Sequence, residues 1–313
     1  MADSLEKENL ATWLRRPSIF VANAWYLLAA AGLYLLPWLW QVLAGLFPGL
    51  VPLLEAMTSP IYNLCLLAFP AAMYAASKPG VSQSMRLRRA RWYECLEACA
   101  LAMPAVVLCG CLGSWWTMLL EAIGGHVEPS GLSLPDDWAG AASTMVSLAI
   151  LPAVCEELLF RGGILGAWER RGTMCGLCVS SVLFCALHGS IQGMPAQLLM
   201  GFTLGLLAIR AGSLLPGMVC HASFNAFSLL MSRFQAGIAV GIPTRIVATG
   251  ASAFVFGALL MMYLGHRQGE PLEQVKAAER EVMQWDELLL LIAGLMTVAV
   301  RYGADLMKVC GLI

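Results

Sequence analysis

Polar side chains inside long apolar segments are the residues of this sequence that could do chemistry. They are Glu156, Glu157, Arg161, His188, His221 and Asn225. An ionisable side chain within hydrocarbon costs several kcal/mol unless it is paired or hydrated, so such residues are functional candidates by default. Carboxylates and imidazoles are also the groups that most often transfer protons in enzymes. The set therefore indicates acid–base chemistry inside a membrane.

Helical spacing separates the roles of the two glutamates. Glu157 and Arg161 are four residues apart, so they share one face of a helix and can pair. Glu156 is turned away from Glu157 by about 100° and is left without a partner on its own helix. We therefore expect Glu157 and Arg161 to hold the helix geometry, and Glu156 to act as the base.

The remaining three residues complete a hydrolytic set. His221 and Asn225 are also four residues apart and can donate hydrogen bonds from one helix face, as a tetrahedral oxyanion requires. His188 comes from a different apolar segment and is left to meet Glu156. The set predicts a water that Glu156 and His188 hold and deprotonate, with no Ser or Cys nucleophile.

Three short motifs carry these residues. Residues 156–161 match EExxxR, residues 184–188 match FxxxH, and residues 221–225 match HxxxN. In this order, on separate apolar segments, they resemble the CPBP family of intramembrane glutamic endopeptidases. That family includes the CAAX proteases and the ABI-type, bacteriocin-processing enzymes. The resemblance covers residues 138–232.

The resemblance implies an activity, a substrate class and roles for the motif residues. The roles are water activation by Glu156 and His188, an oxyanion hole from His221 and Asn225, and support from Glu157, Arg161 and Phe184. The implied substrate is a membrane-embedded or lipidated peptide, either a CAAX-type prenylated protein or a bacteriocin or signal peptide. No cofactor is required by this scheme.

Composition predicts the elements that must position these groups. The chain of 313 residues is 59% hydrophobic and only 12% charged, where a soluble domain carries about 25% charged residues. Apolar blocks of about 20 residues can cross the hydrocarbon core as helices, and the short alternating segments of a membrane β-barrel are absent. We predict an all-α transmembrane bundle with spans at residues 18–47, 57–77, 97–124, 138–168, 172–190, 196–209, 214–232 and 246–265. Residues 288–300 are either a ninth span or an interfacial helix.

Positive charge predicts the orientation of this bundle. Arg and Lys gather before the first span and after the second, fourth, sixth and eighth, and the alternate loops are poor in them. The positive-inside rule therefore places the N-terminus in the cytoplasm. At about 1.5 Å per residue, Glu156, His188, His221 and Asn225 lie at similar depths of about 15 to 25 Å from the Arg-rich face. We expect them to line a cavity that opens to the cytoplasm, either alone or with a second opening sideways to the lipid between helices.

The chain is predicted to be one membrane domain over residues 1–313. Its catalytic core is residues 138–232, and residues 266–287 form a polar cytoplasmic helix. The net charge of −1 gives no indication of a nucleic-acid partner, and the bilayer and the substrate are the expected partners.

Two other functions fit the same residues. In a zinc metalloprotease, Glu156, His188 and His221 would ligate the metal and leave one position for water. In a membrane scaffold or immunity protein, the polar groups would bind a partner without catalysis.

Overall fold

The computed structural model describes residues 16–77, 80–127, 134–235, 241–265 and 283–312. Over these residues the chain is helical and contains no strand, as expected for a polytopic bundle. Most of the predicted polar helix at 266–287 lies outside the described residues; its last three residues belong to the C-terminal helix.

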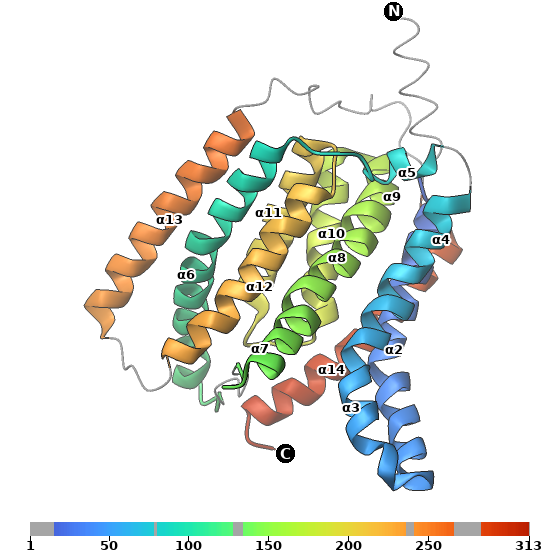
Figure 1. The fold of residues 1–313 in the computed structure, drawn as a ribbon, viewed down its shortest axis with the longest axis horizontal. Coiled ribbons are helices and arrows are strands. Elements are labelled where there is room, and N and C mark those ends of the chain that lie inside the picture. The colour runs from blue at the N-terminus through green and yellow to red at the C-terminus, as the bar shows by residue number, and fades with distance from the viewer. Residues whose placement is uncertain (1–15, 78–79, 128–133, 236–240, 266–282, 313) are drawn as a thin grey trace, which may run out of the picture.

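The first half of the chain forms a hairpin and one long helix. Helix α2 (Ile19–Leu46) is followed by an antiparallel arm, and Figure 1 shows this hairpin extending beyond the rest of the bundle. The arm consists of η1 (Pro48–Leu50), α3 (Val51–Ile61), η2 (Tyr62–Ala68) and α4 (Phe69–Ser77). A short helix, α5 (Val81–Ser84), leads to α6 (Trp92–Ala122).

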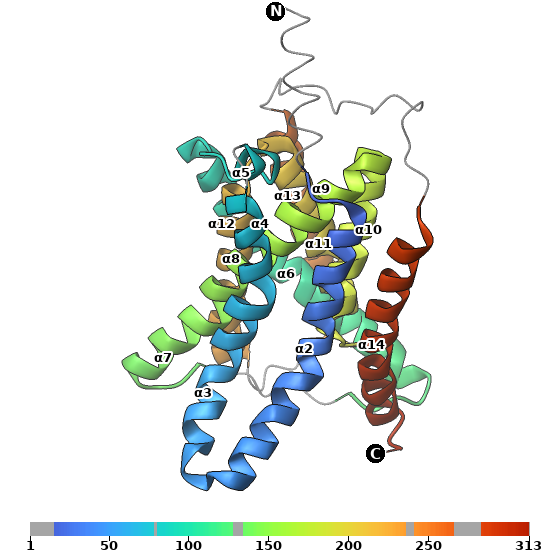
Figure 2. The ribbon, with the colours of Figure 1, turned by 90° about the vertical axis from the view of Figure 1, so that its right-hand side faces the viewer.

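The second half holds the motif residues. One continuous helical run contains α7 (Trp138–Met145), η3 (Val146–Ile150), α8 (Leu151–Glu157), η4 (Leu158–Ile164), α9 (Leu165–Trp168) and η5 (Glu169–Arg171). It is followed by α10 (Thr173–His188), α11 (Met194–Ala211), α12 (Leu215–Gln235), α13 (Ile242–Gly265) and α14 (Trp285–Val309). Figure 1 shows α8, α10, α11 and α12 grouped in the middle of the molecule, with α13 and the α2–α3 hairpin at its two sides, and Figure 2 views the molecule from the side of the hairpin.

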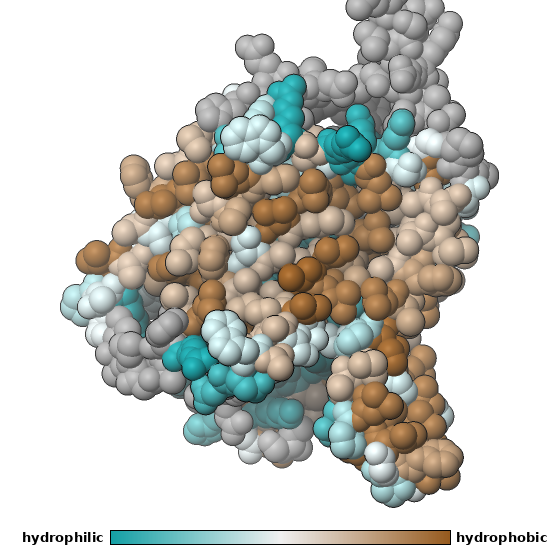
Figure 3. Space-filling model, in the orientation of Figure 1, coloured by the Kyte–Doolittle hydropathy of each residue, from teal (hydrophilic) through white to brown (hydrophobic). Residues whose placement is uncertain are grey.

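Seven helical segments of the described chain are long and apolar enough to cross a membrane, so the protein is a multi-pass membrane protein. The C-terminal stretch is one of them, because α14 has 25 residues and is longer than the sequence pattern predicts. Helix α10 has only 16 residues, and α12 has 21 residues but contains the polar motif residues. Figure 3 shows apolar side chains over the middle of one face, with hydrophilic side chains gathered towards its two ends.

One end of the bundle is closed by a buried ion cluster. The Glu169 carboxylate lies 2.8 Å from Arg16 Nη1 and accepts two bonds of 2.6 and 2.7 Å from Arg86 Nη2. Arg86 also donates to the carbonyl of Arg161 at 3.3 Å and accepts from Leu214 N at 3.0 Å. Burial lowers the pKa of Arg16, and the charge of Glu169 offsets part of this effect. The cluster connects η4 and the start of α12 to the end of the bundle that carries Arg16 and Arg86, which is called the Arg-rich end below.

Candidate active site

Glu157 and Arg161 form the pair that their spacing predicts. Arg161 Nη1 lies 2.8 Å from Glu157 Oε1, and both side chains are 0% exposed. Arg161 Nη2 donates to the carbonyl of Gly201 on α11 at 2.9 Å. A Cβ at Gly201 would lie 3.0 Å from the carbonyl oxygen of Ser181, so the glycine allows α11 to approach α10 closely. The buried guanidinium thus joins the motif helix to its neighbour.

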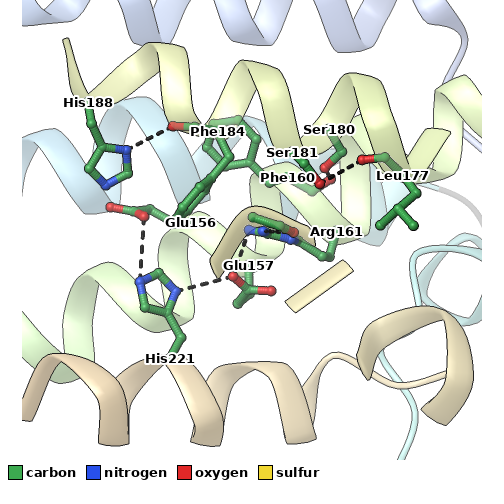
Figure 4. A network of polar contacts seen from close by, with 11 residues as sticks. Glu156, Glu157, Phe160, Arg161, Leu177, Ser180, Ser181, Phe184, His188 and His221 are labelled. Carbon is green, nitrogen blue, oxygen red and sulfur yellow. Dashed lines mark hydrogen bonds and ion pairs between the residues drawn. The ribbon is translucent and has the colours of Figure 1, made fainter. Parts of the chain in front are cut away.

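Glu157 has a second partner that the spacing does not reveal. Its Oε1 also lies 3.2 Å from His221 Nδ1, on α12. The other ring nitrogen of His221, Nε2, lies 3.9 Å from Glu156 Oε2. His221 is therefore held between the two glutamates, as Figure 4 shows, and one carboxylate orients it while the other faces its free nitrogen.

Pro152 explains how Asn225 is held. A proline has no N–H, so it cannot donate to the carbonyl four residues before it, as in an α-helix, or five residues before it, as in a π-helix. These are the carbonyls of Leu148 and Ser147. Asn225 Nδ2 donates to the Leu148 carbonyl at 3.3 Å, and Ser59 Oγ donates to the Ser147 carbonyl at 3.0 Å. Asn225 is thus oriented by a carbonyl that the proline leaves free, and its second amide hydrogen remains for another acceptor.

His188 is the last residue of α10. The helix ends there because Gly189 adopts the left-handed conformation, with φ 59°. His188 Nδ1 lies 2.8 Å from the carbonyl of Phe184. A carbonyl can only accept, so Nδ1 carries a hydrogen, and in the neutral ring Nε2 carries the lone pair. Figure 4 shows the His188 ring turned towards the carboxylate of Glu156.

Phe184 packs against three of the polar side chains at once. Its ring centre lies 4.5 Å from the Arg161 guanidinium carbon, 4.8 Å from the ring centre of His188 and 5.7 Å from that of His221. A cation over an aromatic face is attracted by the quadrupole of the ring. Phe184 therefore fixes the positions of both imidazoles and partly offsets the buried charge of Arg161.

A cavity of about 370 Å³ brings the predicted catalytic residues together. Its lining is Leu148, Pro152, Glu156, His188, His221, Phe224, Asn225, Ser228, Leu229 and Ser232. The side chain of Glu156 is 15% exposed, and its Oε2 has no hydrogen-bond partner within the described part of the chain. Glu157 and Arg161 lie behind this cavity and are not part of its lining.

The direction of the cavity differs from the expected one. Its lining extends along α12 from His221 to Ser232, away from the end that Arg86 and Glu169 close. Towards the Arg-rich end the space behind Glu156 is filled by Glu157, Phe160 and Arg161, each 0% exposed. Within the described residues the cavity thus extends away from the Arg-rich loops, whereas the sequence predicts an opening towards them.

Metal-ligand geometry is the remaining feature of the site. No group of three or more His, Cys, Asp and Glu side chains in the described segments is arranged to hold a metal ion.

These observations define a polytopic helical membrane protein with a glutamate–histidine site between its helices. Residues 138–227 match the family model of Rce1-like type II CAAX prenyl endopeptidases. The matched segment contains every motif residue of the site, and it confirms the resemblance to the CPBP family. The match indicates that the protein is a membrane protease. No curated protein and no solved structure gives a significant match to the chain.

Proposed function

We propose that this protein is an intramembrane endopeptidase of the glutamic type, in which Glu156 and His188 activate the attacking water. The observation that carries the proposal is that Glu156 Oε2, which has no hydrogen-bond partner among the described residues, lies in a cavity between two imidazoles. A buried carboxylate oxygen without a donor is costly, and a bound water would satisfy it. A water at this position would contact a base on one side and His188 on the other.

The hydrogen bonds of His188 suit it to hold this water. Its Nδ1 donates to the Phe184 carbonyl, so Nε2 can accept one hydrogen of the water while Glu156 takes the other. As the water oxygen bonds to the scissile carbonyl carbon, its proton passes to the Glu156 carboxylate. The same proton then passes to the leaving nitrogen when the C–N bond breaks, so Glu156 ends the cycle ionised.

Asn225 and His221 are placed to stabilise the oxyanion of the tetrahedral intermediate. Asn225 can offer its second amide hydrogen. His221 gives its Nδ1 hydrogen to Glu157, so it can donate to an oxyanion only from Nε2, when both ring nitrogens are protonated. Preorganised donors of this kind contribute most where water is excluded.

We propose a CAAX-type prenylated peptide as the substrate, because the matched family is described by that activity. The cavity is lined by apolar Leu148, Phe224 and Leu229 beside polar Ser228 and Ser232. An extended peptide could place its backbone against the serines and its apolar side chains against the others. Bacteriocin-type and signal peptides are the other candidate substrates.

The test is a cleavage assay on the purified full-length chain in liposomes. A farnesylated CAAX peptide, its unprenylated twin and a signal-type peptide are compared, with and without 1,10-phenanthroline. We expect the farnesylated peptide to be cleaved at the same rate with and without the chelator. Loss of cleavage with the chelator and its return with added zinc would instead support the metalloprotease. Tight binding of the peptide without cleavage would support a scaffold.

A further inference from the structure

Helix α14 lies outside the family match, yet it contacts the chain immediately after His188. We propose that Tyr302 and Asp305 of α14 are positioning residues for His188, and that they act through the turn at residues 189–193. The inference rests on the proposed function in giving His188 a catalytic role. Three sets of contacts support it.

The first contact completes the last turn of α10. Gly189 N bonds the carbonyl of Ala186, three residues back, so the carbonyl of Cys185 loses the donor that a regular α-helix would supply. The hydroxyl of Tyr302 donates to this carbonyl at 3.1 Å. Tyr302 thus holds the helical turn that carries His188.

The second contact fixes the turn after His188. Asp305 Oδ2 accepts from Ile191 N at 2.7 Å, a charge-assisted bond of the stronger kind. Trp116 Nε1, on α6, donates to the Ile191 carbonyl at 2.8 Å. Both backbone groups of Ile191 are therefore bonded by side chains from other helices, and the turn has little freedom to move.

The third contact concerns Gly189. Its positive φ favours glycine, and a Cβ at this position would collide with the side chain of Arg301. The cation of Arg301 also lies near the carbonyl end of α10, where the helix dipole favours positive charge. Arg301, Tyr302 and Asp305 lie within about one turn of α14, so they approach the same short segment together.

Helix α14 packs mainly against α2, which also bonds its backbone at two points. Asn23 Nδ2 donates to the Glu287 carbonyl at 2.9 Å, and Tyr34 OH donates to the Thr297 carbonyl at 3.0 Å. Because these bonds do not touch the turn at 189–193, they offer a matched control. Tyr34→Phe removes the same kind of bond as Tyr302→Phe.

The decisive readout is the NMR resonance of the His188 ring. The chain has only 4 histidines, so ¹³Cε1-histidine labelling gives a simple NMR spectrum, and His188→Gln assigns one resonance. We expect Tyr302→Phe and Asp305→Asn each to shift the His188 resonance, while the His221 resonance stays in place. Tyr34→Phe should leave both unchanged. In the cleavage assay kcat should fall by about 10- to 100-fold with little change in KM, as expected for a displaced catalytic group.

The spectrum separates this inference from the proposed function, because it needs no substrate. An unchanged His188 resonance in both Tyr302→Phe and Asp305→Asn would overturn the positioning role. Equal shifts in Tyr34→Phe would do the same, since they would show a general effect of loosening α14. If His188 shifts as expected and no peptide is ever cleaved, the proposed protease fails while the contact between α14 and His188 stands.

Discussion

Glu157 holds His221 by a bond of 3.2 Å between Oε1 and Nδ1, across two helices. The same oxygen also pairs with Arg161 at 2.8 Å. Glu157 is therefore more than a structural counter-ion. It joins the guanidinium that anchors the motif helix to the imidazole that faces the cavity, so we expect its removal to affect stability and chemistry together.

Glu157→Gln should lower both stability and activity. Breaking a fully buried ion pair by removing one partner costs about 3–5 kcal/mol in unfolding free energy. His221 also exchanges a charged acceptor for a weaker neutral one, so we expect kcat to fall by about tenfold or more. Thermal melts and the cleavage assay measure the two effects.

The double change Glu157→Gln with Arg161→Met separates these effects. It removes both buried charges, so it should recover part of the stability without recovering kcat. The exposed pair of Arg233 and Asp136, at 2.8 Å, supplies the matched control, and Asp136→Asn should change neither quantity. Full recovery of kcat in the double variant would show that Glu157 does not act through His221.

Gly217→Ala should disturb the same carboxylate by a different route. A Cβ at Gly217 would lie 3.2 Å from Glu157 Oε2, closer than most side-chain contacts. Overpacking of this kind costs about 1–3 kcal/mol, and the displaced Glu157 should reduce kcat. Gly257→Ala on α13 is the control, because nothing lies within 4 Å of its Cβ position. Normal activity in Gly217→Ala would mean that Glu157 tolerates displacement.

Asn225→Ala should remove one donor from the oxyanion. Losing such a donor typically costs about 100-fold or more in kcat, and KM should change little because the bond strengthens only as charge develops. Ser223→Ala is the control: it lies on the same helix, with its hydroxyl bonded to Cys99 Sγ at 3.4 Å. A rise in KM with unchanged kcat would instead assign Asn225 to substrate binding.

The side of entry can be tested by cysteine labelling. Because the cavity lining reaches Ser232, near the end of α12, Ser232→Cys should gain labelling by a membrane-impermeant maleimide over the unchanged chain. That labelling should come from the membrane side opposite to a tag at the N-terminus. With a cytoplasmic N-terminus, as the charge pattern predicts, it comes from outside. Labelling from the side of the tag would contradict the direction of the cavity.

The sequence predicted the members of the site better than their contacts. Motif spacing indicated Glu156, His188, His221 and Asn225, and all four line one cavity. Helical spacing also predicted the Glu157–Arg161 pair. Such spacing reports only neighbours on one helix, however, so it could not show that Glu157 reaches His221 on α12.

Other features depended on packing between distant segments. The direction of the cavity depends on which side of Glu156 is occupied by packed side chains. The depth of a residue along its helix does not predict that side. The contact of Asp305 with Ile191 joins residues 114 positions apart, and no motif marks it. Pro152 was a signal that could have been used, because a proline inside a span leaves carbonyls that another side chain must satisfy.

Glu156 is proposed above as the base that activates water. Glu156→Gln keeps the shape of the side chain but cannot take a proton from water, and the loss of a general base reduces rates by about 10²- to 10⁴-fold. The direct measurement is the single-turnover rate of farnesyl-peptide cleavage by Glu156→Gln in liposomes, beside its melting temperature. We predict a loss in that range with unchanged melting, since Glu156 Oε2 has no hydrogen-bond partner to lose within the described chain. A rate within about tenfold of that of the unchanged protein would show that Glu156 is not the base.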